Sequence, residues 1–355
     1  MNRLLSLLAA GVLLCIPVFG QEDPETVRNY PELSIITRVD AYPFSPSVYT
    51  LLEGSLGDHL SYSVCNVWVN DDIKSLYANT LRADESDWCL WGYLSLDLGN
   101  WHIQAGKNYI FTGGFEIDAY DYDQYWQMTS NFWNNAQVYQ YGGALQYVTP
   151  SEGDTFSLQV LSSPFSGKPF EDGLLSYSAE WRGEHGPWQT IWGVSGIDYN
   201  PEAYSWGDKI WLLSAGNQFE ISDSFNCGID YMYRIASPFL NLPCAGDNPP
   251  FYPVNSGHDV VGRINWRPLD WLEAGLKGVF ETSLPDVKTM TGDLFGIPEQ
   301  YLSGAACLQF YPLKEKDDLR IHALAGVNNL DGFYWGAGVT YNFPLTQTLL
   351  NRHAK

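Results

Sequence analysis

Basic residues are scarce in this chain: 19 Lys and Arg stand against 41 Asp and Glu among 355 residues, which gives a formal net charge of -22. This balance argues against nucleic acid as a partner, because phosphate binding requires clustered Lys and Arg. A wholly disordered acidic chain is excluded as well, since 45% of the residues are hydrophobic and 15% are aromatic. The chain can therefore order a large structure.

Long apolar runs are lacking beyond the first twenty residues. Arg3 precedes an apolar run that reaches Phe19, and the small residue Gly20 follows it, which is typical of a Sec signal peptide over residues 1–20. After this leader no apolar stretch approaches the roughly 20 residues that a membrane-spanning helix needs. We expect an exported protein that is either soluble or embedded in a membrane through strands.

Cysteine pairs and catalytic motifs are also missing. Five cysteines remain after the leader, and their odd number and lack of C-x-x-C spacing argue against a disulfide framework and a zinc site. No G-x-S-x-G, H-E-x-x-H, P-loop or dinucleotide-binding motif occurs. Glu116 and Asp118 have the residue types of a glycosidase pair, but two acids within an acidic loop give that reading little support. We therefore predict no enzyme activity, no cofactor and no metal.

The chain does contain a regular alternation of apolar and polar residues from residue 33 to residue 343. A period of two is typical of strands with one apolar and one polar face. Short turns alternate with mostly longer loops between these runs, which is the layout of an outer-membrane barrel with its short turns in the periplasm. Counting the runs gives sixteen strands with both chain ends on the short-turn side, and eighteen if a long loop hides a hairpin.

The predicted fold class is therefore an all-β, transmembrane antiparallel barrel over residues 33–343. An N-terminal periplasmic segment, residues 21–32, precedes it. A C-terminal extension, residues 344–355, follows it and either lies in the periplasm or folds back into the pore.

Aromatic residues fit this fold, because their rings suit the interface between lipid and water. Five tryptophans lie beside the expected short turns, as an interfacial girdle requires: Trp101, Trp181, Trp188, Trp266 and Trp271. A secreted β-sandwich or propeller with aromatic platforms for sugars is the alternative. The asymmetry of turns and loops and the even strand number favour the barrel.

The third long connection, residues 110–136, is predicted to fold into the lumen and narrow it. Its acidic and aromatic candidates for the constriction are Glu116, Asp118, Tyr120, Asp121 and Asp123, and it has no Lys or Arg. Strand phase places four basic residues on the lumen wall: Arg182, Arg263, Lys277 and Arg320. Acid facing base would set up a transverse field that orients polar solutes. Alternatively, the loop acids are solvated charges near lipopolysaccharide, bridged by divalent cations.

Several short motifs resemble segments of the porins of Bacteroidetes outer membranes, distant relatives of the phosphate-selective porin O/P family. The motifs are Gly106-Lys107, Gly113-Gly114-Phe115-Glu116, Phe132-Trp133-Asn134-Asn135 and Glu180-Trp181-Arg182-Gly183-Glu184. The resemblance implies a homotrimeric channel in the cell outer membrane, in contact with lipid and lipopolysaccharide, for passive diffusion of small hydrophilic solutes and ions.

One departure from the resemblance concerns selectivity. Phosphate-selective pores present a ladder of Arg and Lys, which this chain lacks, so we do not expect phosphate selectivity. The acidic third loop instead predicts a mild preference for cations. The competing function is a secreted or surface aromatic-rich β protein that binds carbohydrate without conducting.

Overall fold

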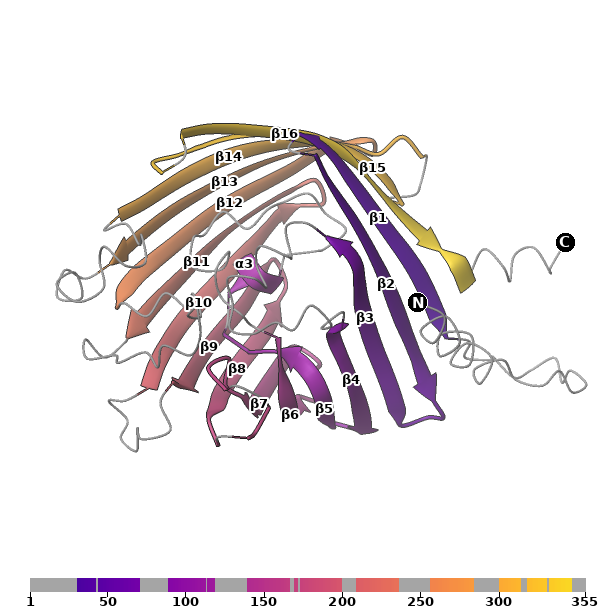
Figure 1. Ribbon diagram of the computed structural model, residues 1–355, viewed down its shortest axis with the longest axis vertical. Coiled ribbons are helices and arrows are strands. Elements are labelled where there is room, and N and C mark those ends of the chain that lie inside the picture. Colours follow the sequence, from indigo (N-terminus) through magenta and orange to yellow (C-terminus); the bar gives the residue numbers. More distant parts are fainter. Residues whose placement is uncertain are drawn as a thin grey trace, which may run out of the picture.

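The computed structural model contains a closed antiparallel β-barrel of sixteen strands, in which each strand pairs with its neighbours in sequence and β1 pairs with β16 (Figure 1). The structure describes residues 31–42, 44–70, 89–112, 114–118, 139–166, 169–171, 173–199, 209–235, 256–283, 300–313, 318–330 and 332–346. The predicted count of sixteen is confirmed. The alternative of eighteen is wrong, because the sixteen strands already close the ring.

The first eight strands are β1 (Glu32–Tyr42), β2 (Phe44–Leu56), β3 (Leu60–Asn70), β4 (Cys89–Leu98), β5 (Trp101–Tyr109), β6 (Tyr139–Val148), β7 (Asp154–Ser162) and β8 (Leu175–His185). The second eight are β9 (Trp188–Asp198), β10 (Lys209–Ser222), β11 (Phe225–Ile235), β12 (Gly257–Leu269), β13 (Leu272–Ser283), β14 (Gln300–Phe310), β15 (Leu319–Asn328) and β16 (Gly332–Pro344). A short helix, α3 (Phe115–Asp118), follows β5.

The alternation in sequence becomes two chemically different walls. On β8, Ser176 and Ser178 are buried against the interior, whereas Tyr177 between them is 41% exposed on the outside. The same division recurs around the barrel, where large apolar side chains such as Leu158 and Leu276 are exposed. An apolar outer wall suits hydrocarbon, and closure leaves no unpaired strand edge.

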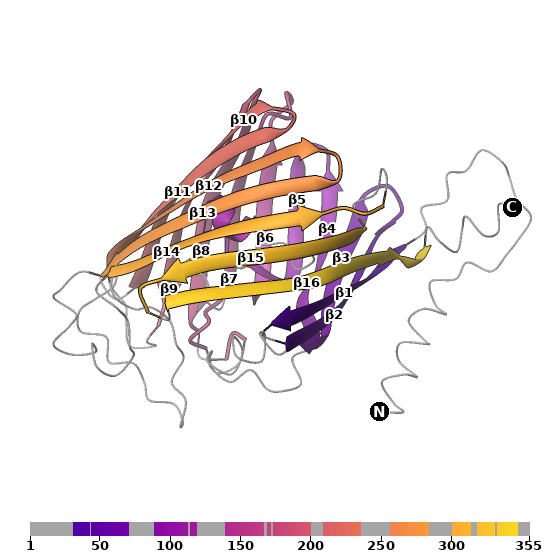
Figure 2. The ribbon, with the colours of Figure 1, turned by 90° about the horizontal axis from the view of Figure 1, so that it is seen from above.

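Short connections join the strands at one end of the barrel, whereas at the opposite end only β1 to β2 and β15 to β16 are joined by so few residues (Figure 2). They include residues 57–59, 99–100 and 223–224, and the two ends of the barrel domain, at Ser34 of β1 and Pro344 of β16, pair in register on the same side. We call this the short-turn end and the opposite one the long-loop end. The predicted parity is thus confirmed, with both ends of the barrel at the short-turn end.

Aromatic side chains ring the outside of the short-turn end. Trp101, Trp266 and Trp271 are about half exposed, and Trp181 packs edge-on against Trp188 with ring centroids 6.4 Å apart. Rings at this height match the interfacial girdle that the sequence predicts.

The chain turns into the barrel after β5. Figure 1 shows α3 inside the ring of strands, and α3 contacts β10 and β11. The prediction of a third connection folded into the lumen is confirmed for its described part. Within the described ranges, no helix is both long and apolar enough to cross a membrane.

Candidate functional site

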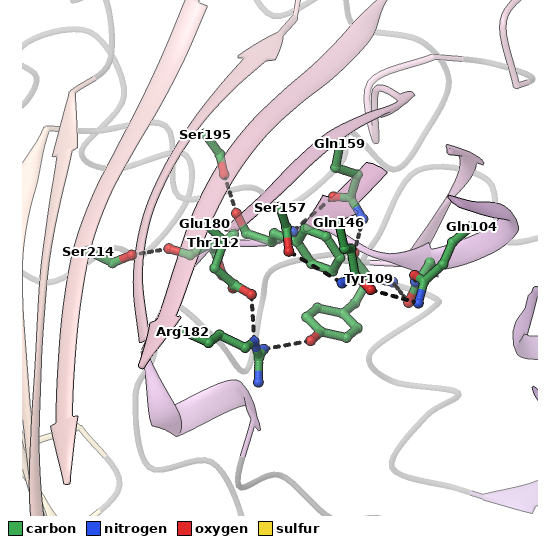
Figure 3. A network of polar contacts seen from close by, with 12 residues as sticks. Gln104, Tyr109, Thr112, Gln146, Ser157, Gln159, Glu180, Arg182, Ser195 and Ser214 are labelled. Carbon is green, nitrogen blue, oxygen red and sulfur yellow. Dashed lines mark hydrogen bonds and ion pairs between the residues drawn. The ribbon is translucent and has the colours of Figure 1, made fainter. Parts of the chain in front are cut away.

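The described start of the third connection, residues 110–112 and 114–118, is called the lumen segment here. It runs along the inner wall of the barrel, and side chains of the wall form hydrogen bonds with successive backbone groups of the segment (Figure 3). Gln159 of β7 holds the first step, since its amide donates to the Tyr109 carbonyl at 2.9 Å and accepts from the Phe111 N–H at 3.0 Å. Ser195 of β9 then donates to the Phe111 carbonyl at 2.7 Å.

One serine and two glycines set the middle of the segment. Ser214 of β10 donates to the Thr112 carbonyl, and the Gly114 N–H donates to the backbone of β9 at 3.1 Å. Gly216 faces this point from β10, and a Cβ atom there would lie 2.7 Å from Gly114 Cα. The absence of a side chain at Gly216 therefore allows backbone to lie directly against wall.

Charged residues of β11, β12 and β13 fix the end of the segment. The Phe115 N–H donates to Asp230 Oδ1 at 2.9 Å, and Arg263 donates to the Phe115 carbonyl at 2.9 Å, with its guanidinium 4.8 Å from the centre of the Phe115 ring. Lys277 Nζ lies 2.8 Å from Glu116 Oε2, and both side chains are almost fully buried. The pair is thus desolvated, and separating it would leave an uncompensated charge.

The lumen segment is shorter than the arc of inner wall between the first and last strands that it contacts. From β7 to β13 there are six strand spacings, about 29 Å at the usual separation. Residues 111–116 span five steps and reach at most about 18 Å. The segment must therefore cut across the curved wall as a chord, with long side chains such as Arg263 and Lys277 bridging to it. A chord of this kind reduces the open cross-section.

A second polar network lies on β5 to β8, beside the start of the segment (Figure 3). Arg182 donates to Glu180 at 2.6 Å and to the Tyr109 hydroxyl at 2.8 Å. Next to them, Gln104 and Gln146 are joined by a hydrogen bond of 3.3 Å. Arg182 therefore supports the residue from which the segment departs.

The structure brings together some of the predicted site residues and separates others. Glu116 is in the segment, and Lys277 and Arg263 contact the segment from the wall. Arg182 contacts Tyr109, the last residue of β5 before the segment. Arg320 is apart from the segment: it pairs in register with Thr340 near the short-turn end of β15. Asp118 belongs to α3, but its side chain lies outside the described part, as do Tyr120, Asp121 and Asp123.

The geometry at Glu116 differs from the sequence-based expectation. A transverse field requires acid and base separated across open water, whereas Glu116 contacts Lys277 directly. The physical reason is the chord: it brings the loop acid against the wall of β13, where the two charges neutralise each other.

Sequence reasoning missed the polar wall residues that hold the backbone, namely Gln159, Ser195, Ser214 and Asp230. Strand phase could have placed each of them on the lumen face. It could not have shown that a distant segment supplies their partners, because that pairing depends on the path of the loop in three dimensions.

Comparison with solved structures gives matches among bacterial outer-membrane proteins. A loop L8 deletion mutant of OmpT, an outer membrane protein of Vibrio cholerae, is 13% identical with a TM-score of 0.53, over 90% of this chain and 99% of that chain. A porin refined at 1.8 Å resolution is 11% identical with a TM-score of 0.54, over 88% of this chain and 99% of that one. A triple mutant of Rhodopseudomonas blastica porin is 10% identical with a TM-score of 0.50, over 89% and 99%.

No protein-family profile matches the sequence, and no curated protein does. The resemblance to Bacteroidetes and phosphate-selective porins stays an expectation drawn from the motifs. At such low identities the structural likeness concerns the fold alone: this chain has the sixteen-stranded barrel architecture of bacterial outer-membrane porins.

Proposed function

We propose that this protein is an outer-membrane channel for passive diffusion of small hydrophilic solutes and ions, narrowed by the lumen segment. The proposal rests on the series of contacts from Gln159 to Lys277. These contacts bind the segment to side chains of the inner wall between β7 and β13. A barrel built only as a scaffold has no need of a segment anchored across its interior. Its apolar outer wall and polar inner wall suit a membrane-spanning pore.

A mild preference for cations is the finer part of the proposal. The third connection has four acidic residues and no Lys or Arg, and Lys277 neutralises one of them, Glu116. The other three, Asp118, Asp121 and Asp123, form an acidic excess that would concentrate cations at the constriction.

The proposal includes the placement of the chain in the cell. Residues 1–20 act as a Sec signal peptide, the short turns face the periplasm together with residues 21–32 and 344–355, and the long loops face lipopolysaccharide outside. Three copies associate, as the resemblance implies. Cross-linking of the protein in isolated outer membranes tests both the location and the trimer.

Single-channel recording in planar lipid bilayers tests the function. Refolded, heat-modifiable protein should give stepwise, ohmic currents in KCl, and a salt gradient should give a reversal potential that favours K⁺. Anion selectivity would refute the role of the loop acids while leaving the channel. Absence of any conductance would refute the channel and favour the alternative, a surface protein that binds carbohydrate without conducting.

A further inference from the structure

A polar recess with a volume of about 260 Å³ lies in the lumen wall formed by β10 to β13. Arg263 and Lys277, which hold the lumen segment, form one boundary of the recess. Asp223 and Ser224, in the turn between β10 and β11, form the other. The recess therefore lies between the constriction and the short-turn end, where a solute that has passed the segment arrives next.

Charges of both signs surround this recess. Arg263, Arg267 and Lys277 line it together with the carboxylates of Asp223 and Glu273, and Lys277 also binds Glu116. Glu273 accepts hydrogen bonds from the Tyr311 hydroxyl at 3.0 Å and from Gln309 at 3.2 Å. Burial and the nearby Glu273 raise the pKa of Tyr311, so its hydroxyl stays a donor. An ion of either sign meets attraction and repulsion together and gains little net Coulomb energy.

Two asparagines offer neutral hydrogen-bonding groups at the same place. Asn265 Nδ2 donates to Asn226 Oδ1 at 3.1 Å, and both residues line the recess. A carboxamide carries two donors and two acceptor lone pairs, so this bond leaves the Asn226 amide nitrogen and the Asn265 carbonyl oxygen with capacity for further hydrogen bonds. A donor thus lies next to an acceptor on the wall.

We propose that the recess is a low-affinity binding site for an uncharged, polyhydroxylated solute of monosaccharide size. Each hydroxyl group both donates and accepts, which matches the adjacent donor of Asn226 and acceptor of Asn265. The volume is just below the 300–1,000 Å³ of sites for drug-sized ligands and suits one sugar ring. The inference rests on the proposed channel function, because the solute reaches the recess through the lumen.

Current recordings with D-glucose as the probe test the site. In a planar bilayer in KCl, D-glucose should reduce the single-channel current in a saturable, concentration-dependent way. Gluconate and glucosamine have a similar size but carry a charge, so they should need higher concentrations for the same reduction. Stronger blockade by either charged compound would overturn the assignment to uncharged solutes.

Substitutions in the two asparagines locate the site. The double variant Asn226→Ala/Asn265→Ala should keep the KCl conductance and raise the half-blocking glucose concentration about thirtyfold, the effect of losing two neutral hydrogen bonds of about 1 kcal/mol each. Asn342→Ala removes an amide on β16, outside the recess and apart from the lumen segment, and should keep the wild-type glucose blockade.

The possible failures are distinguishable. A conducting channel without saturable blockade, or a double variant blocked like the wild type, would overturn the recess as a sugar site and leave the channel function intact. A folded protein that never conducts would overturn the proposed function itself.

Discussion

At the scale of single residues, a glycine decides how closely the lumen segment approaches the wall. A Cβ atom on Gly216 would lie 2.5 Å from Asp230 Oδ1 and 2.7 Å from Gly114 Cα. Gly114 itself has φ +93°, a conformation that other residues rarely adopt. Gly216→Ala should therefore push the segment away from β10, because crowding of this kind costs about 1–3 kcal/mol. We expect a larger and noisier single-channel conductance with little change in the thermal unfolding of the barrel.

Gly262→Ala is the matched control for this substitution. Gly262 lies on β12, and a Cβ atom there would have no neighbour within 4 Å. This variant should conduct as the wild type does. Equal conductance of all three proteins would contradict the anchoring of the segment at β10.

At the scale of the element, the ion pair between Glu116 and Lys277 holds the far end of the lumen segment. Removing one partner of a buried pair costs about 3–5 kcal/mol, and the segment can avoid this cost by detaching into the water of the lumen. Glu116→Gln and Lys277→Met should therefore both raise the conductance. Their effects on reversal potential should be opposite: loss of the acid lowers cation preference, whereas loss of the base increases it.

Arg320→Met is the control that separates the effect of lost charge from the effect of a detached segment in Lys277→Met. It removes the same charge as Lys277→Met from a lumen strand, but at a site apart from the segment. It should shift the reversal potential toward cations without raising the conductance. If Lys277→Met behaves in the same way, the ion pair does not hold the segment.

The lumen segment also shows where prediction from sequence ends. Strand phase predicts Arg182, Arg263 and Lys277 on the inner wall, because inward and outward positions alternate along a strand whatever surrounds it. The partner of Lys277 could not be read in this way, since Glu116 reaches it through a loop path that no local pattern encodes. A charge that was expected to act across open water is instead neutralised at 2.8 Å.

At the scale of the whole molecule, the strand number was predictable, because turn spacing and parity are properties of the linear chain. The interactions that close the ring were not. His322 of β15 and Arg38 of β1 both contact Asp40, at 2.9 Å and 3.1 Å, and β16 lies between these two strands. At the short-turn end, Thr346 accepts a hydrogen bond from the Leu33 N–H. The first strand is thus joined to β15 through side chains, in addition to its backbone pairing with β16.

The close packing of β1 against β16 depends on a glycine of β16, Gly338. A Cβ atom on Gly338 would lie 2.5 Å from the Val39 carbonyl oxygen, 2.5 Å from Asp40 Oδ1 and 2.6 Å from His322 Nε2. The backbone oxygen cannot move without disturbing the pairing of β1 with β16, so Gly338→Ala should destabilise the barrel by about 1–3 kcal/mol. The measurement is the temperature at which the heat-modifiable band shifts on gel electrophoresis. Gly304→Ala on β14, whose nearest neighbour would be 3.9 Å away, should leave this temperature unchanged. Equal transition temperatures for the two variants would mean that β1 closes onto β16 without the contacts across Gly338.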